Sequence, residues 1–192
     1  GARVAGDDHH GGVCYAGLLS GRHVAGRRVA VIGAGGIGFD VALYLAEPDD
    51  AAQTEPAAFR EHWGIGTAPR RKGPARQVTM LQRSPGAMGR SLGKTTGWVH
   101  RIEVARAGIE QISGVTYRGI DDAGLHIATA GGDRVIAADT IVLCAGQEER
   151  RDLAAALGDG ACPVHVIGGA RLAADVDAKR AIDEGVRLAV TI

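Results

Sequence analysis

Three glycines between an apolar run and a helical pattern carry the clearest chemical signal in this sequence. Gly33, Gly35 and Gly38 form a G-x-G-x-x-G pattern after the apolar residues 29–32 and before the helical apolar pattern of 39–45. A strand, a glycine turn and a helix in this order predict a dinucleotide-binding site. The first glycine allows a tight turn, the second lets a pyrophosphate approach the backbone, and the third lets helix and strand pack closely. The helix then presents free N–H groups and the positive end of its dipole to the phosphates.

Three neighbours of these glycines complete this part of the candidate site. Gly36 and Ile37 lie inside the pattern, and we predict that both contact the cofactor. Asp40 follows just inside the predicted helix, and two roles stay open for it. Its carboxylate either interacts with the helix dipole or lies near the nicotinamide, where it would shape the position of the carboxamide or of a flavin edge.

The end of the second predicted strand indicates which dinucleotide binds. NAD sites place an acidic residue there for the ribose 2′-hydroxyl, whereas NADP sites often place an arginine nearby. Here residues 77–81 run into Gln82, Arg83 and Ser84, with no carboxylate. The Arg83 guanidinium can donate charge-assisted hydrogen bonds to a 2′-phosphate, and the Ser84 hydroxyl can add another. We therefore predict NADPH as the ligand, with a set of solvated surface cations as the alternative interpretation.

A second glycine-containing segment, residues 93–98, has some features of a phosphate-binding loop. It lacks the upstream glycine and the preceding strand of such a loop, so we do not expect a nucleotide-hydrolysing P-loop. Lys94 and Thr95 stand at the start of a predicted helix and are candidates for cofactor contacts. The alternative is a helix N-cap and a surface lysine.

Periodicity and turn residues predict the elements that must position these side chains. We expect strands at 28–32 and 77–81, an extended segment at 109–112 and a buried strand at 140–144. We also expect helices at 36–46, 55–63 and 96–107, a short helix near 13–19, and a β-meander at 115–120, 125–130 and 133–137. A βαβ unit, a helix, a meander and a returning strand occur in the order expected for the pyridine-nucleotide domain of flavoproteins that bind two dinucleotides.

The returning strand leads into Gly146, which is a further candidate cofactor contact. Beyond it we predict a helix at 151–157, a strand at 164–167, a turn at Gly168 and Gly169, and a helix at 176–188. This second strand–turn–helix order either faces a polar cofactor or is a plain connection, and the pattern alone favours neither.

Composition restricts the partners and the compartment. The chain of 192 residues is 45% hydrophobic, and its 22 basic residues balance 22 acidic ones, which gives no support for binding to nucleic acid or a membrane surface. Cys14, Cys144 and Cys162 fit no metal-binding spacing, so reduced thiols in the cytoplasm are the simplest interpretation. We find no membrane-length apolar run, signal peptide or metal site, and we expect a solvated turn at residues 7–10. Because the chain starts at Gly1, we expect a piece of a longer polypeptide.

Several segments together resemble the C-terminal part of bacterial NADPH-dependent 2,4-dienoyl-CoA reductases. They are VIGAGGIGFD (31–40), EHWGI (61–65), MLQR (80–83), LGKTTGWVHR (92–101), LCAGQE (143–148) and VIGG (166–169), in this order. The resemblance implies an iron–sulfur flavoenzyme of the old yellow enzyme-like family. In such a protein a TIM barrel holds FMN and the acyl-CoA, a 4Fe-4S cluster follows, and an FAD domain is interrupted by an NADPH domain.

The resemblance also implies a division of the chain. Residues 1–26 would connect from the FAD domain, 27–147 would form the NADPH-binding domain, and 148–192 would be the C-terminal segment of the FAD domain. The expected fold is therefore α/β: a Rossmann-like three-layer pyridine-nucleotide domain with an inserted β-meander, plus a fragment of an FAD-binding domain. By position, the resemblance places FAD contacts at Gly169, Asp175, Val176 and Asp177, with Gly168 beside them.

The expected function is to bind NADPH and deliver its hydride to FAD, for the reduction of unsaturated fatty acyl-CoA in β-oxidation. The catalytic acid, FMN and the 4Fe-4S cluster would lie in the rest of the polypeptide, so we assign no catalytic residue here and expect the isolated chain to be inactive. The expected partners are that remainder, with self-association of the fragment when its apolar FAD-facing surface is uncovered. The alternatives are the same module of a trimethylamine-dehydrogenase-like or enoate-reductase-like protein, or a non-catalytic nucleotide-binding module.

Overall fold

The computed structural model describes residues 12–47, 55–66, 74–158, 160, 162–174 and 177–192. These residues fall into two compact units, 12–145 and 146–192, and each is treated by itself below. The three-part division that the resemblance implies, with its assignment to two cofactor domains, stays a prediction.

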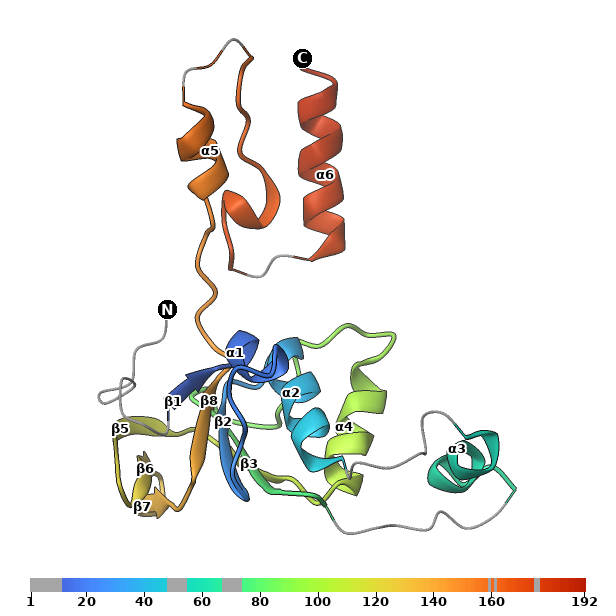
Figure 1. The fold of residues 1–192 in the computed structure, drawn as a ribbon, viewed down its shortest axis with the longest axis vertical. Coiled ribbons are helices and arrows are strands. Elements are labelled where there is room, and N and C mark those ends of the chain that lie inside the picture. Colours follow the sequence, from blue (N-terminus) through green and yellow to red (C-terminus); the bar gives the residue numbers. More distant parts are fainter. Residues whose placement is uncertain (1–11, 48–54, 67–73, 159, 161, 175–176) are drawn as a thin grey trace. The chain divides into compact units, whose positions relative to one another are not determined.

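A parallel sheet forms the middle of the first unit (Figure 1). Its strands, in spatial order, are β1 (Gly12–Cys14), β8 (Thr140–Leu143), β2 (Arg28–Ile32), β3 (Gln77–Gln82) and β4 (Glu110–Ser113). All four neighbouring pairs run parallel. Parallel sheets are covered on both faces, which explains why β2 and β8 are nearly continuous apolar runs.

Helices cover one face of this sheet and a β-meander covers the other (Figure 1). On the helical side lie α2 (Gly36–Ala46) and α4 (Gly97–Arg106). The meander is antiparallel and consists of β5 (Thr116–Asp121), β6 (Gly124–Thr129) and β7 (Gly132–Ile136). The three-layer α/β arrangement with an inserted meander that the sequence predicts is confirmed.

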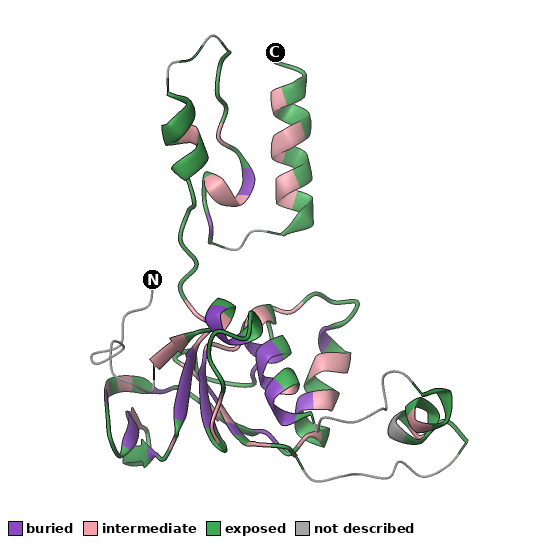
Figure 2. Ribbon diagram, viewed as in Figure 1, coloured by how far each residue is buried: buried purple, intermediate pink, exposed green. Residues whose placement is uncertain are grey.

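Successive side chains of β2 point to opposite faces of the sheet, so the strand contributes to one hydrophobic core on each face. Val31 faces the helices and is packed with Phe39 of α2, whereas Ile32 faces the meander and is packed with Leu125. All four side chains are almost completely buried. Figure 2 shows the buried residues of β2, β8 and α2 in purple. The glycine turn that follows Ile32 is therefore held between two packed layers.

The N-terminal part of this unit differs from the expected helix at 13–19. The helix α1 spans only Tyr15–Leu19, and Gly12–Cys14 form the edge strand β1. This strand pairs with β8, more than a hundred residues away in the chain, so no local pattern reveals it. The expected helix at 55–63 is present as α3 (Pro56–Trp63), which has proline at its start and ends at Gly64 with φ +68°.

The second unit contains α5 (Asp152–Leu157), the 3-10 helix η2 (Gly168–Ala170) and α6 (Ala178–Ala189). The strand predicted at 164–167 is wrong, because these residues form no strand. A strand needs a neighbour for its backbone hydrogen bonds, and no described residue pairs with this segment. No helix in the described part of the chain is long and apolar enough to cross a membrane.

Candidate dinucleotide-binding site

The first turn of the site begins at Gly33, which directly follows β2 and has φ +115°. A Cβ at Gly33 would stand 3.0 Å from the carbonyl carbon of Cys144 and 3.1 Å from the backbone nitrogen of Ala145. Both the positive φ and the lack of space therefore require glycine. The Gly33 N–H donates to the carbonyl oxygen of Leu81 at 2.9 Å, which attaches the turn to β3.

Gly38 lies against this turn from the helix. A Cβ at Gly38 would overlap the carbonyl oxygen of Gly33 and stand 2.9 Å from its carbonyl carbon. The absence of a side chain thus lets the first residues of α2 approach the end of β2, which fixes the direction of the helix relative to the sheet.

Gly35 and Gly36 face open space, in contrast to the other two glycines. No heavy atom lies within 4 Å of a Cβ built on either residue, and both are exposed. Gly35 is the N-cap of α2, and no side chain caps the helix there. The first N–H groups of a helix lack intrahelical partners, so this end of α2 offers donors to an anion. Ile37 is half-buried and packs against the core beneath.

Arg83 and Ser84 follow β3 at the same edge of the sheet. Ile32 and Leu81 are paired in register, so the residues that follow each strand emerge next to each other. The structure therefore brings the glycine turn and Arg83 together at the carboxyl ends of parallel strands, where open α/β sheets bind their ligands.

The surroundings of Arg83 suit a negatively charged group. Arg83 is exposed, and no described carboxylate forms an ion pair with it. Burial raises the pKa of the Tyr117 hydroxyl to about 12, and the nearby positive charge of Arg83 acts against this rise. Tyr117 of β5 therefore lies within electrostatic range of Arg83, a relationship that no sequence pattern indicated.

The backbone beyond Arg83 is held by a side chain that the sequence reading also missed. The amide Nε2 of Gln82 donates to the carbonyl oxygens of Ser84 at 3.0 Å and Gly86 at 3.1 Å. The Ser84 carbonyl also accepts the N–H of Gly114 at 3.1 Å. The only signal in the sequence was a glutamine directly before the arginine.

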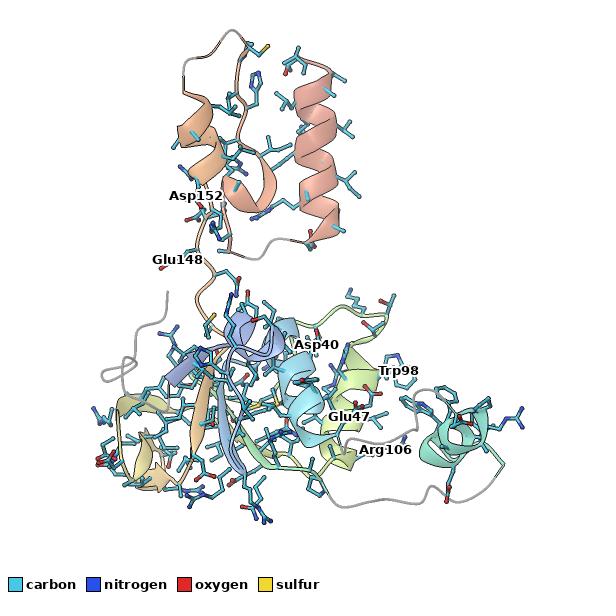
Figure 3. All side chains as sticks on the ribbon, viewed as in Figure 1. Asp40, Glu47, Trp98, Arg106, Glu148 and Asp152 are labelled. Carbon is cyan, nitrogen blue, oxygen red and sulfur yellow. The ribbon has the colours of Figure 1, made fainter. Side chains whose placement is uncertain are left out.

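Asp40 is the fifth residue of α2, so it lies beyond the first turn, which contains no acidic residue. The helix-dipole role is therefore disfavoured, because the effect of the dipole falls off within one turn. Asp40 points toward α4 instead: its Oδ1 lies 3.9 Å from Nδ1 of His100, which is also 3.9 Å from Oε2 of Glu103 (Figure 3).

Lys94 and Thr95 lie in the exposed loop that precedes α4. The N-cap of α4 is Thr96, so the N-cap interpretation of Thr95 is wrong. The Thr95 carbonyl instead accepts the indole N–H of Trp98 at 3.0 Å. Arg101 of α4 donates a 3.0 Å hydrogen bond to the carbonyl of Gly89, which connects this loop to α4.

The candidates of the second unit are engaged in contacts of their own. The Gly168 N–H donates to Oε2 of Glu184 at 2.6 Å, and Arg171 pairs with the other oxygen of that carboxylate at 2.5 Å. Arg171 and the Gly168 N–H hold the pKa of Glu184 down at about 2. Asp177 caps α6 by accepting the N–H of Arg180 at 2.8 Å.

Four more residues after β8 are predicted cofactor contacts, and the structure describes two of them, Gly146 and Gly169. Gly146 begins the second unit and has φ +78°, and Gly169 is half-buried in η2. Asp175 and Val176 lie outside the described residues. The candidates near Gly33 and those near Gly168 thus belong to different units, and the cofactor contacts predicted for both groups stay predictions.

Comparison with known proteins identifies the fold that carries this site. Residues 11–169 match the family described as pyridine nucleotide-disulphide oxidoreductase. The chain belongs to the pyridine nucleotide-disulphide oxidoreductase family. This family of oxidoreductases has a Rossmann-like nucleotide-binding fold, and the matched residues include the glycine turn.

Among curated proteins, this pyridine nucleotide-disulphide oxidoreductase resembles a metal reductase of Desulforamulus reducens (strain ATCC BAA-1160 / DSM 100696 / MI-1). The two are 27% identical over 152 residues, which are 73% of this chain and 21% of the relative. The chain therefore spans about a fifth of that protein's length.

Two solved structures share the fold. A complex of 2-naphthoyl-CoA reductase with 2-naphthoyl-CoA has a TM-score of 0.72 and 24% identity over 100% of this chain and 25% of its own. The 6-hydroxypseudooxynicotine amine oxidase of Pseudomonas geniculata N1 has a TM-score of 0.68 and 20% identity over 96% of this chain and 25% of its own. At these identities the likeness shows the fold alone.

Proposed function

We propose that this chain binds NADPH and presents its nicotinamide to a flavin, as the electron-entry part of a larger oxidoreductase. One observation carries the proposal: the uncapped start of α2 lies at the same sheet edge as Arg83, which no described carboxylate neutralises. Together they offer a site for a pyrophosphate and a site for a 2′-phosphate.

The residues of the first unit fit this ligand. Gly35 and Gly36 leave the space that a Cβ would fill, so phosphate oxygens can reach the first N–H groups of α2. Arg83 and Ser84 would hold the 2′-phosphate, while Lys94 and Thr95 would contact the cofactor from the loop before α4. When bound, NADPH supplies the hydride, and the protein supplies orientation and electrostatics.

The described residues of the second unit fit FAD less well. The Gly168 N–H is already donated to Glu184, and the Asp177 carboxylate caps α6. Gly168 and Asp177 are therefore not free to contact a flavin in this unit by itself. Its assignment to an FAD domain, together with residues 1–26, rests on the resemblance to the dienoyl-CoA reductases. FMN and a 4Fe-4S cluster would lie in other parts of a longer polypeptide.

The reaction that we propose for the whole protein is the reduction of a 2,4-dienoyl-CoA. The shared motifs support it, and the similar 2-naphthoyl-CoA reductase also acts, by its name, on a CoA thioester. Amine oxidation is the second candidate, because the similar fold of 6-hydroxypseudooxynicotine amine oxidase belongs to an amine-oxidising protein.

The partner that we propose is the remainder of the same polypeptide, in the cytoplasm. The three cysteines are free, as expected for a reducing compartment. An apolar side chain recurs every four residues along α6 and its C-cap: Ile182, Val186 and the C-cap residue Val190 are 66%, 59% and 80% exposed. An apolar stripe of this kind supports self-association of the chain when nothing covers it.

Calorimetric titration of the 192-residue chain with NADPH and NADH tests the cofactor assignment. NADPH should bind more tightly, and Arg83→Ala should weaken NADPH binding roughly 10- to 100-fold, because it removes charge-assisted hydrogen bonds. NADH affinity should stay the same. Arg118→Ala, which removes an exposed arginine from β5, is the matched control. Equal affinity for both nucleotides, or an unchanged preference in Arg83→Ala, would overturn the assignment.

A further inference from the structure

The last residue of β3 folds its side chain over the turn that follows it. Gln82 is half-buried, and its Nε2 donates to two carbonyl oxygens, those of Ser84 and Gly86. Because both partners are acceptors, the amide nitrogen must face the turn, and the side chain acts as a clamp with two donor hydrogens. The backbone that it spans is the segment that carries Arg83.

The clamped segment has the sequence of a tight turn. Pro85 is followed by Gly86, whose φ is +91°. Proline then glycine with a positive φ is the residue pattern of a type II turn. Gln82 donates to the carbonyls of Ser84 and Gly86, one on each side of Pro85, so these two hydrogen bonds hold the turn in one geometry.

The two residues that connect β4 to β5 fix the same segment from the other side. The N–H of Gly114 donates to the Ser84 carbonyl at 3.1 Å, and the N–H of Val115 donates to the Gln82 carbonyl at 3.1 Å. The backbone is therefore fixed on both sides of Arg83, whose side chain stays exposed with no described ion-pair partner.

We propose that Gln82 is a positioning residue that determines specificity: its amide holds the backbone at Arg83 where the guanidinium meets the ribose 2′-phosphate of NADPH. Gln82 itself does not touch the ligand. The inference rests on the proposed function, because it assumes that Arg83 binds the 2′-phosphate of NADPH.

The physical reason is pre-organisation. An arginine on a mobile turn must lose backbone and side-chain freedom when it binds an anion, whereas an arginine on a fixed turn loses side-chain freedom only. The clamp therefore strengthens binding of a ligand with a 2′-phosphate and leaves a ligand with a 2′-hydroxyl unaffected.

The test compares Gln82→Met, which keeps the side-chain length but has no donor, and Gln82→Leu, which also has no donor and adds no charge beside Arg83. Gln111→Met, at an exposed glutamine of β4, is the matched control. Calorimetry with 2′,5′-ADP and 5′-AMP measures the adenosine end of the site alone, and NADPH and NADH are titrated in parallel. Thermal unfolding and the NMR amide signal of Arg83 are recorded for each variant.

Loss of the clamp should weaken the binding of 2′,5′-ADP and NADPH about tenfold, which is the effect of losing about one net hydrogen bond. The affinities for 5′-AMP and NADH should not change. The Arg83 amide signal should shift or broaden, and Gln82→Met should have no further effect on NADPH affinity in an Arg83→Ala background.

Three results would overturn the inference. Equal weakening of the binding of all four ligands would indicate a general structural role for Gln82. If the Gln82 variants keep the preference for NADPH over NADH and Arg83→Ala abolishes it, Gln82 has no positioning role and the NADPH assignment stands. If Arg83→Ala leaves the preference intact, the cofactor assignment fails, and the role of Gln82 fails with it. If Gln82→Met does not fold, Gln82→Leu decides by the same measurements.

Discussion

Gly38 and Gly33 lie so close that a methyl group on Gly38 would overlap the carbonyl oxygen of Gly33. The third glycine of the turn therefore packs directly on the first, and the start of α2 is set by contact with the end of β2. The open positions Gly35 and Gly36 lie between them, so the same four residues combine close packing with free space for a ligand.

Replacing Gly38 should damage both stability and binding. Gly38→Ala introduces an overpacked methyl group, which should lower the free energy of unfolding by about 1–3 kcal/mol. Urea unfolding measures this change, and calorimetry should show weaker NADPH binding because α2 is displaced. Gly36→Ala is the control: its Cβ meets open space on a helical residue, so stability should stay the same or rise by about 0.5–1 kcal/mol. Equal stability losses in both variants would contradict the packing argument.

The second unit should lose stability in acid through Glu184. Arg171 and the Gly168 N–H lower the pKa of this carboxyl from 4.5 to about 2 in the folded chain. The stabilisation is therefore present above pH 4.5 and is lost as the pH falls from 4.5 toward 2. The protection factor of the Gly168 amide against hydrogen exchange, taken relative to the intrinsic rate at each pH, should fall over this range. Glu184→Gln should lower this protection factor at neutral pH and flatten its pH profile, whereas a profile unchanged by this substitution would refute the assignment.

The three thiols should differ in reactivity. Burial raises the pKa of Cys144 to about 12, whereas Cys14 and Cys162 are exposed. At neutral pH the thiolate fraction of Cys144 should be lower by on the order of a thousandfold than that of an ordinary thiol, so iodoacetamide should leave it unmodified. Mass spectrometry should find label on Cys14 and Cys162 in the native chain and on all three after unfolding in guanidinium. Rapid native labelling of Cys144 would show that the end of β8 is open.

Local signals predicted the elements around the site well. The strand at 28–32 and the helix at 36–46 have the predicted bounds, because an apolar run, three glycines and Pro48 mark their limits within the segment itself. The predicted strand at 164–167 is wrong, because apolar residues form a strand only when a neighbour supplies hydrogen bonds.

Contacts between residues far apart in the chain could not be predicted from local sequence patterns. The edge strand β1 depends on β8, and Gly168 depends on Glu184, sixteen residues later. Neither pairing leaves a pattern within one segment, so both appear only when distant residues meet.

The sequence by itself determined the glycine turn, the order of elements and the presence of Arg83 without an acidic neighbour, since these depend on residue types and short spacings. Only the tertiary structure decided that Arg83 emerges beside the open start of α2 and that Gln82 clamps its backbone. It also decided that Asp40 faces His100. The physical reason is that backbone preferences act over a few residues, whereas a site is assembled by strand register and packing between residues far apart in the chain.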